Sequence, residues 1–319
     1  MAIHHITAIA GDPGRNLRFY TRTLGLRLVK LTVNYDDPAT YHFYFGDELG
    51  RPGTILTFFP WPDGSPGRLG TGLVAAVGFA IPPGSLGFWI ERLLAQGVRY
   101  QGPTRRFEEP VLAFADPDGL ALELIATERA REIPGWADGP VPPEHAIRAL
   151  HGATVWEDGD SGAADLLTGQ LGFRRAAEEG NFLRLHGGDE RGAVLDLRRA
   201  PGFWRGAGGV GIVHHIAFRA ADSADQVARR TALEQAGYDV TPVLDRTYFR
   251  SVYFREPGGV LFEVATDGPG FTVDESVAEL GTSLKLPARY EPIRERVAGA
   301  LPSLLLPPAL QRAPVDPWP

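Results

Sequence analysis

The chain has 319 residues, of which 44% are hydrophobic and 22% charged, as expected for a soluble globular protein with room for two domains. A formal net charge of −7 argues against nucleic acid or an anionic membrane surface as a partner, and no apolar run is long enough to span a bilayer. The chain contains no cysteine, which excludes disulfides, thiolate nucleophiles and zinc–thiolate sites.

The first part of the chain predicts two copies of one strand–helix–strands unit. The first copy opens with a strand that contains His5, continues into helical spacing over 16–26, and includes a strand of alternating aromatic residues over 40–45. The second copy runs from a strand over 72–80 through a helix over 85–96. It ends in a strand that contains Glu123.

The same unit recurs twice in the second part of the chain. His151 opens a strand that precedes helical spacing over 163–173. A strand around His215 is followed by a helix over 223–236 and by strands that contain Tyr253 and Glu263. The chain is therefore predicted to consist of four copies of the unit in two tandem pairs.

Composition suggests where these pairs are divided. A segment over 133–148 that is rich in Pro and Gly is the predicted linker between an N-terminal domain, 1–132, and a C-terminal domain, 149–268. The repeat stops after Gly268. Residues 269–319 form a predicted extension with a short helix near 291–300 and a Pro-rich tail.

Two histidine pairs and one carboxylate are candidates for a metal site. His4-His5 and His214-His215 each stand in a strand of β-branched residues, and Glu263 lies within an apolar strand that follows a Pro-Gly-Gly turn. Burying an unpaired carboxylate there would cost several kcal/mol. Two imidazoles and one carboxylate form the metal site typical of non-haem iron enzymes, which leaves coordination positions open for substrate or O₂.

These stretches resemble the vicinal-oxygen-chelate superfamily, which contains glyoxalases, bleomycin-resistance proteins and extradiol dioxygenases. The likeness extends to its hydroquinone and ring-cleaving dioxygenase branch. The matching stretches are 4–7, 41–50, 52–54, 211–215, 245–246, 258–263 and 270–275. The resemblance implies an α+β fold of four βαβββ modules in two tandem pairs, with curved mixed sheets and one metal cavity shared by the first and fourth modules. It also implies that His5, His215 and Glu263 bind Fe(II), with Mn(II) as an alternative.

Further residues are candidates for catalysis and substrate binding. The resemblance implies catalytic roles for Tyr253 and Arg246, and for His4 and His214 close to the substrate. Successive strand residues point to opposite faces, so these two histidines should point away from the metal unless the strand bulges. The predicted substrate-binding residues are Thr7, His42, Phe43, Trp204 and Phe271.

A second cavity, between the second and third modules, should lack a metal. It would offer Val77, Glu123 and His151 at the corresponding positions, and valine cannot be a ligand. One metal per chain is therefore expected.

The leading hypothesis is a non-haem Fe(II)-dependent dioxygenase that opens a hydroquinone or catechol ring with O₂. A glyoxalase-like lyase or isomerase is less favoured, because such sites usually need a second carboxylate and the strand over 53–60 has none. A metal-free binding or resistance protein is the third alternative. The expected partners are an aromatic diol and O₂, and we expect a cytoplasmic homo-oligomer. The sequence leaves open the preferred ring, the choice between iron and manganese, and the bond that is cleaved.

Overall fold

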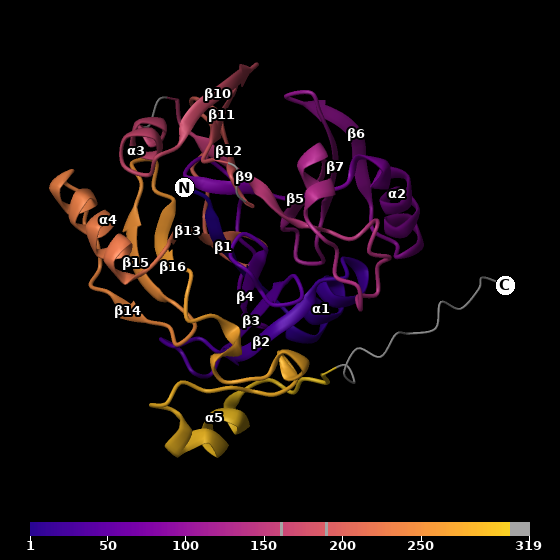
Figure 1. Cartoon of the computed structure of the whole chain (residues 1–319), viewed down its shortest axis with the longest axis vertical. Coiled ribbons are helices and arrows are strands. Elements are labelled where there is room, and N and C mark those ends of the chain that lie inside the picture. Colours follow the sequence, from indigo (N-terminus) through magenta and orange to yellow (C-terminus); the bar gives the residue numbers. More distant parts are fainter. Residues whose placement is uncertain (160–161, 189–190, 307–319) are drawn as a thin grey trace.

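The computed structural model describes residues 1–306 apart from 160–161 and 189–190. It contains two mixed sheets of eight strands each (Figure 1). In spatial order, the first sheet consists of β14 (Leu244–Asp245), β15 (Arg250–Arg255), β16 (Leu261–Thr266), β13 (Val213–Ala220), β1 (Ile3–Ala10), β4 (Ile55–Pro60), β3 (Tyr41–Gly46) and β2 (Arg27–Val33). The second consists of β10 (Arg174–Glu179), β11 (Phe182–His186), β12 (Val194–Arg199), β9 (Ala149–Glu157), β5 (Leu73–Ile81), β8 (Ala121–Ala126), β7 (Glu109–Ala115) and β6 (Tyr100–Arg106).

Each predicted unit has one helix between its first and second strands. These helices are α1 (Pro13–Arg18), α2 (Leu86–Ala95), α3 (Ala163–Gly169) and α4 (Ser223–Gln235). The strand and helix order therefore repeats as βαβββ four times, which confirms the predicted α+β class and the four modules. None of the described helices is long and apolar enough to cross a membrane.

The first helix begins earlier than its apolar spacing predicts. Asp12 caps it, since its side chain accepts a hydrogen bond from the Arg15 backbone N–H at 2.6 Å, and Pro13 occupies the first turn. The helix then widens into a π-helical turn over Phe19–Thr23, which places Tyr20 against Phe58 of the sheet, with ring centroids 4.5 Å apart.

Each sheet takes one module from the first half of the chain and one from the second. In the first sheet β1 pairs antiparallel with β13, and in the second β5 pairs antiparallel with β9. The first and fourth modules are thereby joined through their opening strands (Figure 1). This brings the His4-His5 strand beside the His214-His215 strand.

Two β-bulges interrupt the ladder between β1 and β13. Ile3 pairs with Phe218 and His5 with Ala217, so His4 is an extra residue in β1. Thr7 pairs with His215 and Ala8 with Val213, so His214 is an extra residue in β13. A bulge re-aims the side chain at the extra position, and the simple alternation of faces fails there.

The described part of the C-terminal extension lies along the outer strands of the first module (Figure 1). Lys285 donates its backbone N–H to Leu31 in β2, and Lys30 is fully buried against Asp274 and Glu275 of the extension. The predicted short helix is present as α5 (Arg294–Ala300), preceded by a 3₁₀ turn over Glu291–Ile293. The extension is therefore packed onto the module that carries His5.

Candidate metal centre

The side chains of His5, His215 and Glu263 converge between β1, β13 and β16. The Nε2 atoms of the two histidines are 3.4 Å apart, and the Glu263 Oε2 atom lies 3.0 Å from His215 Nε2 and 3.4 Å from His5 Nε2. All three side chains are buried. Among the described residues, they are the one group of three or more His, Asp or Glu side chains close enough to hold a metal ion.

The donor atoms fit a divalent metal. Ligand bonds of about 2.0–2.2 Å set neighbouring ligands at right angles about 3 Å apart, close to the separations observed here. The Oε2 atom of Glu263 is buried without a hydrogen-bond partner, whereas Ser251 donates its hydroxyl to Oε1. A buried carboxylate oxygen in this position is suited to a cation. Burial alone would raise the pKa of Glu263, but His5 and His215 hold it well below its ordinary value.

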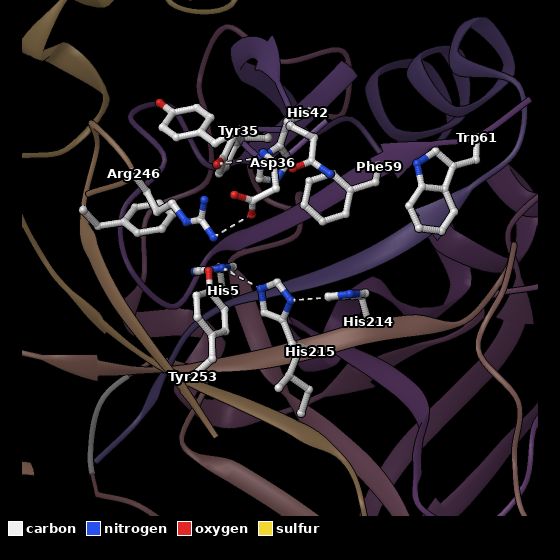
Figure 2. A pocket seen from close by; sticks show the side chains of 14 residues that line it. His5, Tyr35, Asp36, His42, Phe59, Trp61, His214, His215, Arg246 and Tyr253 are labelled. Carbon is white, nitrogen blue, oxygen red and sulfur yellow. Dashed lines mark hydrogen bonds and ion pairs between the residues drawn. The ribbon is translucent and has the colours of Figure 1, made fainter. Parts of the chain in front are cut away.

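The bulged histidines fix the orientation of the two ligand rings. The Nδ1 atom of His5 is 2.9 Å from that of His4. The Nδ1 atom of His215 is 2.7 Å from that of His214 (Figure 2). Each ligand ring therefore uses Nδ1 for a neighbour and presents Nε2 to the metal position. Burial lowers the pKa of His4 well below its ordinary value and, together with His215, lowers the pKa of His214 to about 4. Neutral imidazoles of this kind can accept the Nδ1–H that a metal-bound ring carries.

A cavity of about 310 Å³ opens beside the two ligand rings (Figure 2). Of the predicted site residues, those that line this cavity are His5, His42, His214, His215, Arg246 and Tyr253. Burial and the Glu263 carboxylate raise the pKa of the Tyr253 phenol above its ordinary value, so this hydroxyl stays protonated and can donate.

The structure places the other predicted substrate-binding residues elsewhere. Phe43 is fully buried on the opposite face of β3, 5.4 Å from the Tyr41 ring, because strand residues alternate between faces. Trp204 is 57% exposed and donates to the Leu69 carbonyl, away from the cavity. Phe271 packs against Tyr248 at 5.2 Å between ring centroids and does not line the cavity.

Thr7 also lies behind the cavity wall. Its hydroxyl is 2.8 Å from that of Thr57, which in turn is 2.9 Å from His42 Nε2. The His42 Nδ1 atom is 2.9 Å from the Tyr44 hydroxyl. Thr7 therefore reaches the cavity only through His42, whose ring is held by hydrogen bonds at both nitrogens.

Several cavity residues are absent from the sequence-based prediction. They are Asn34, Tyr35, Asp36, Tyr44, Phe59, Trp61, Phe249 and Leu261. Alternation along β3 could have placed Tyr44 beside His42, since both share one face. Asn34, Tyr35 and Asp36 follow β2 in a loop, and no sequence pattern indicates which way a loop folds over a cavity.

The second sheet shows which residues correspond to the candidate metal ligands. Glu263 pairs with Ala217, and Ala217 pairs with His5. Glu123 pairs with Gly78, and Gly78 pairs with Gly152. Gly152 therefore occupies the position of His5.

This register corrects two expected counterparts by one residue. Ala76, rather than Val77, occupies the position of His215, since Ala76 pairs with Thr154 as His215 pairs with Thr7. His151 is the bulged residue and matches His4. A Cβ at Gly152 would collide with the Val194 carbonyl, so no histidine fits there.

Glu123, the counterpart of Glu263 in the second sheet, is already paired with an arginine. Arg106 donates two hydrogen bonds to Glu123, at 2.9 and 2.6 Å, and His151 lies 3.0 Å from Glu109. The guanidinium supplies the positive charge that a cation would otherwise provide.

Comparison with known proteins places the chain in a family. The sequence profile of the Glyoxalase/Bleomycin resistance protein/Dioxygenase superfamily matches residues 2–124 and 160–264. The chain is 47% identical to the "Putative ring-cleaving dioxygenase MhqO" of Bacillus subtilis over 95% of this chain and 96% of that protein. It is 36% identical to the "Chlorohydroquinone/hydroquinone 1,2-dioxygenase" of Sphingobium indicum over 92% of this chain and 94% of that protein.

Solved structures support the same assignment. A crystal structure described as a putative dioxygenase from Bacillus subtilis superposes with a TM-score of 0.90 at 45% identity and covers 98% of this chain and 99% of that one. Glyoxalase I from Zea mays superposes with a TM-score of 0.63 at 17% identity, over 83% of this chain and 92% of that one, which shows a shared fold. By sequence and by fold, the chain belongs to the glyoxalase/bleomycin resistance protein/dioxygenase superfamily.

Proposed function

We propose that this protein is a ring-cleaving dioxygenase that uses a divalent metal, iron or manganese, to open a hydroquinone-type ring with O₂. The observation that carries the proposal is the convergence of His5 Nε2, His215 Nε2 and Glu263 Oε2 beside an open, largely aromatic cavity. Relatives named as ring-cleaving and hydroquinone dioxygenases match nearly the whole chain.

Three protein ligands on one side of a metal leave other positions for small molecules. A bound divalent iron or manganese would offer positions for an ionised ring hydroxyl and for O₂, and would allow electrons to pass between them. The cavity beside those positions is within the size range of small-molecule sites.

The chain's own residues position the ring and handle protons. Phe59 and Trp61 line the cavity and give it an apolar wall for an aromatic ring. The protonated Tyr253 hydroxyl can donate a hydrogen bond to an oxygen of the substrate.

The lyase alternative is less well supported. Metal-dependent lyases of this fold usually need a second carboxylate ligand, and none of the residues of β4 is acidic. The described carboxylate that lines the cavity, Asp36, is paired with Arg246.

Oxygen uptake by the metal-loaded protein tests the proposal. Protein loaded anaerobically with Fe(II), and separately with Mn(II), is given hydroquinone, chlorohydroquinone, methylhydroquinone and catechol in turn. We expect uptake that matches the loss of aromatic absorbance and that is absent in His215→Ala. A tightly bound metal without oxygen uptake would favour the lyase, and the absence of metal binding would leave a binding protein. Light scattering of the same sample tests the predicted homo-oligomer.

A further inference from the structure

Two oppositely charged side chains face each other at the wall of the cavity. Asp36, in the loop between β2 and β3, and Arg246, directly after β14, both line it. The Arg246 Nη2 atom donates to Asp36 Oδ2 at 3.0 Å (Figure 2). The other lining residues that the structure describes, apart from the histidines, carry no ionised side chain at neutral pH.

The arginine of this pair is held in place. Its side chain is 16% exposed, and its guanidinium carbon lies 5.9 Å from the centre of the Tyr35 ring and 5.6 Å from that of Tyr253. Two aromatic faces therefore restrain the cation. The Asp36 side chain is 72% exposed, so it lies on the solvent side of the pair.

The loop that carries Asp36 is anchored at its backbone. The Tyr290 hydroxyl donates to the Tyr35 carbonyl at 2.8 Å, and Arg289 donates to the same oxygen. The Asp36 backbone N–H donates to Asn34 Oδ1 at 3.0 Å. Contacts with the C-terminal extension thus position the carboxylate opposite Arg246, although the two residues come from different modules.

An unpaired arginine in a pocket for aromatic diols would be a ready site for a carboxylate on the ring. Here the guanidinium already has a carboxylate partner. We propose that Asp36 determines substrate specificity: it occupies Arg246, excludes dihydroxybenzenes with a ring carboxylate, and selects those with uncharged substituents. This inference rests on the proposed function, because it names the substrate class of the same cavity.

The discrimination has two physical sources. A ring carboxylate must either displace Asp36 from Arg246 or enter the cavity without a cationic partner, and each alternative costs free energy. It must also approach the negative charge of Asp36 itself, which acts as a repulsive element against the wrong substrate. A methyl or chloro substituent carries no charge, so it neither needs Arg246 as a partner nor is repelled by Asp36.

The experiment compares wild type with charge-removing and charge-keeping variants. Asp36→Asn and Asp36→Ala remove the charge, and Asp36→Glu keeps it. Asp37→Asn is the matched control, because Asp37 is exposed, is the next residue in the chain and does not line the cavity. Its carboxylate accepts a hydrogen bond from the Thr40 hydroxyl. The probes are methylhydroquinone and 2,5-dihydroxybenzoate, given to Fe(II)-loaded protein.

Two readouts are made on each variant. Oxygen uptake gives kcat and KM for both probes, and anaerobic calorimetry gives the affinity for each without turnover. We expect the ratio of kcat/KM for the acid to that for methylhydroquinone to rise by about tenfold in Asp36→Asn and Asp36→Ala, mainly through KM for the acid. Asp36→Glu and Asp37→Asn should keep the wild-type ratio.

The outcomes separate this inference from the proposed function. A ratio in both charge-removing variants that stays within about twofold of wild type would overturn the role of Asp36, as would a wild type that prefers the acid. If neither probe is turned over, the dioxygenase proposal fails. The calorimetric affinities then still decide whether Asp36 discriminates against the carboxylate.

Discussion

The Nδ1 atom of His214 lies 2.7 Å from the Nδ1 atom of His215, although the two residues are consecutive in one strand. A regular strand would point their rings to opposite faces, and the bulge at His214 removes that constraint. His4 stands in the same relation to His5. Each proposed histidine ligand is therefore oriented by its own neighbour in the chain.

Replacing His214 by Phe should weaken metal binding about 10- to 100-fold, because the His215 ring would lose its Nδ1 partner while keeping its Nε2 atom. Metal affinity is measured by competition with a chelator, and folding by circular dichroism. His145→Gln is the control, since the His145 ring stacks on Phe88 outside the metal centre. Unchanged affinity in a folded His214→Phe protein would show that the ring pair does not support the metal.

Glu263→Gln should weaken metal binding by at least about 100-fold, because the variant removes the negatively charged ligand. Elemental analysis after gel filtration measures the bound metal. Glu123→Gln is the matched control in the second sheet, where Arg106 rather than a metal faces the carboxylate.

The control variant Glu123→Gln should lose stability rather than metal. Glu123→Gln should retain the metal but lower the free energy of unfolding by about 1–3 kcal/mol, because Arg106 loses two charge-assisted hydrogen bonds while keeping Asp196 at 3.1 Å. Denaturant titration measures that loss. Loss of metal in Glu123→Gln with retention in Glu263→Gln would place the metal in the second sheet and contradict the proposed site.

Asp116 should make the stability of the fold depend on pH. Burial raises its pKa to about 6, against backbone hydrogen bonds from Leu120 and Asp118 that lower it, and Tyr20 also donates to it at 3.0 Å. The folded state therefore binds a proton more tightly than the unfolded chain, in which the pKa is about 3.9. The free energy of unfolding should fall as pH rises from about 4 to about 6. Above that range the destabilisation by the ionised Asp116 should stay constant.

The variant Asp116→Asn isolates this contribution. The unfolding free energy of the wild type minus that of Asp116→Asn should increase by about 2 kcal/mol as pH falls from 7 to 4. Urea titrations at several pH values measure it. A flat profile for Asp116→Asn would contradict the raised pKa.

Lys30→Met should destabilise the protein by about 3–5 kcal/mol, because it leaves Asp274 and Glu275 near a buried position without their cation. It should also loosen the C-terminal extension, which limited proteolysis detects as faster cleavage beyond Gly268. Lys285→Met is the control. Its side chain is 28% exposed and its Nζ atom lies 3.9 Å from Glu275, so the expected loss is below about 1 kcal/mol. Equal losses in both variants would contradict a special role for Lys30.

Much of this protein could be predicted from local sequence patterns. Strand alternation, helical spacing and the recurrence of His and Glu in apolar strands indicate four repeated modules and single out two histidine pairs and Glu263. The choice of His5 and His215 within those pairs is implied by the resemblance to the superfamily. Helix ends were less accurate. The first helix begins at Pro13 because of the Asp12 cap, and the third ends at Gly169, before the predicted 173.

The tertiary structure alone decided the walls of the cavity and the exact counterparts of the ligands. The bulges at His4, His214 and His151 arise from pairing between distant strands, so periodicity along one strand could not locate Ala76 and Gly152 or aim the histidine rings. The contact between Asp36 and Arg246 joins two loops from opposite ends of the chain. The sequence by itself determined which chemical groups are present and in which repeated units. Their mutual positions depend on nonlocal strand register and loop packing, which no local pattern encodes.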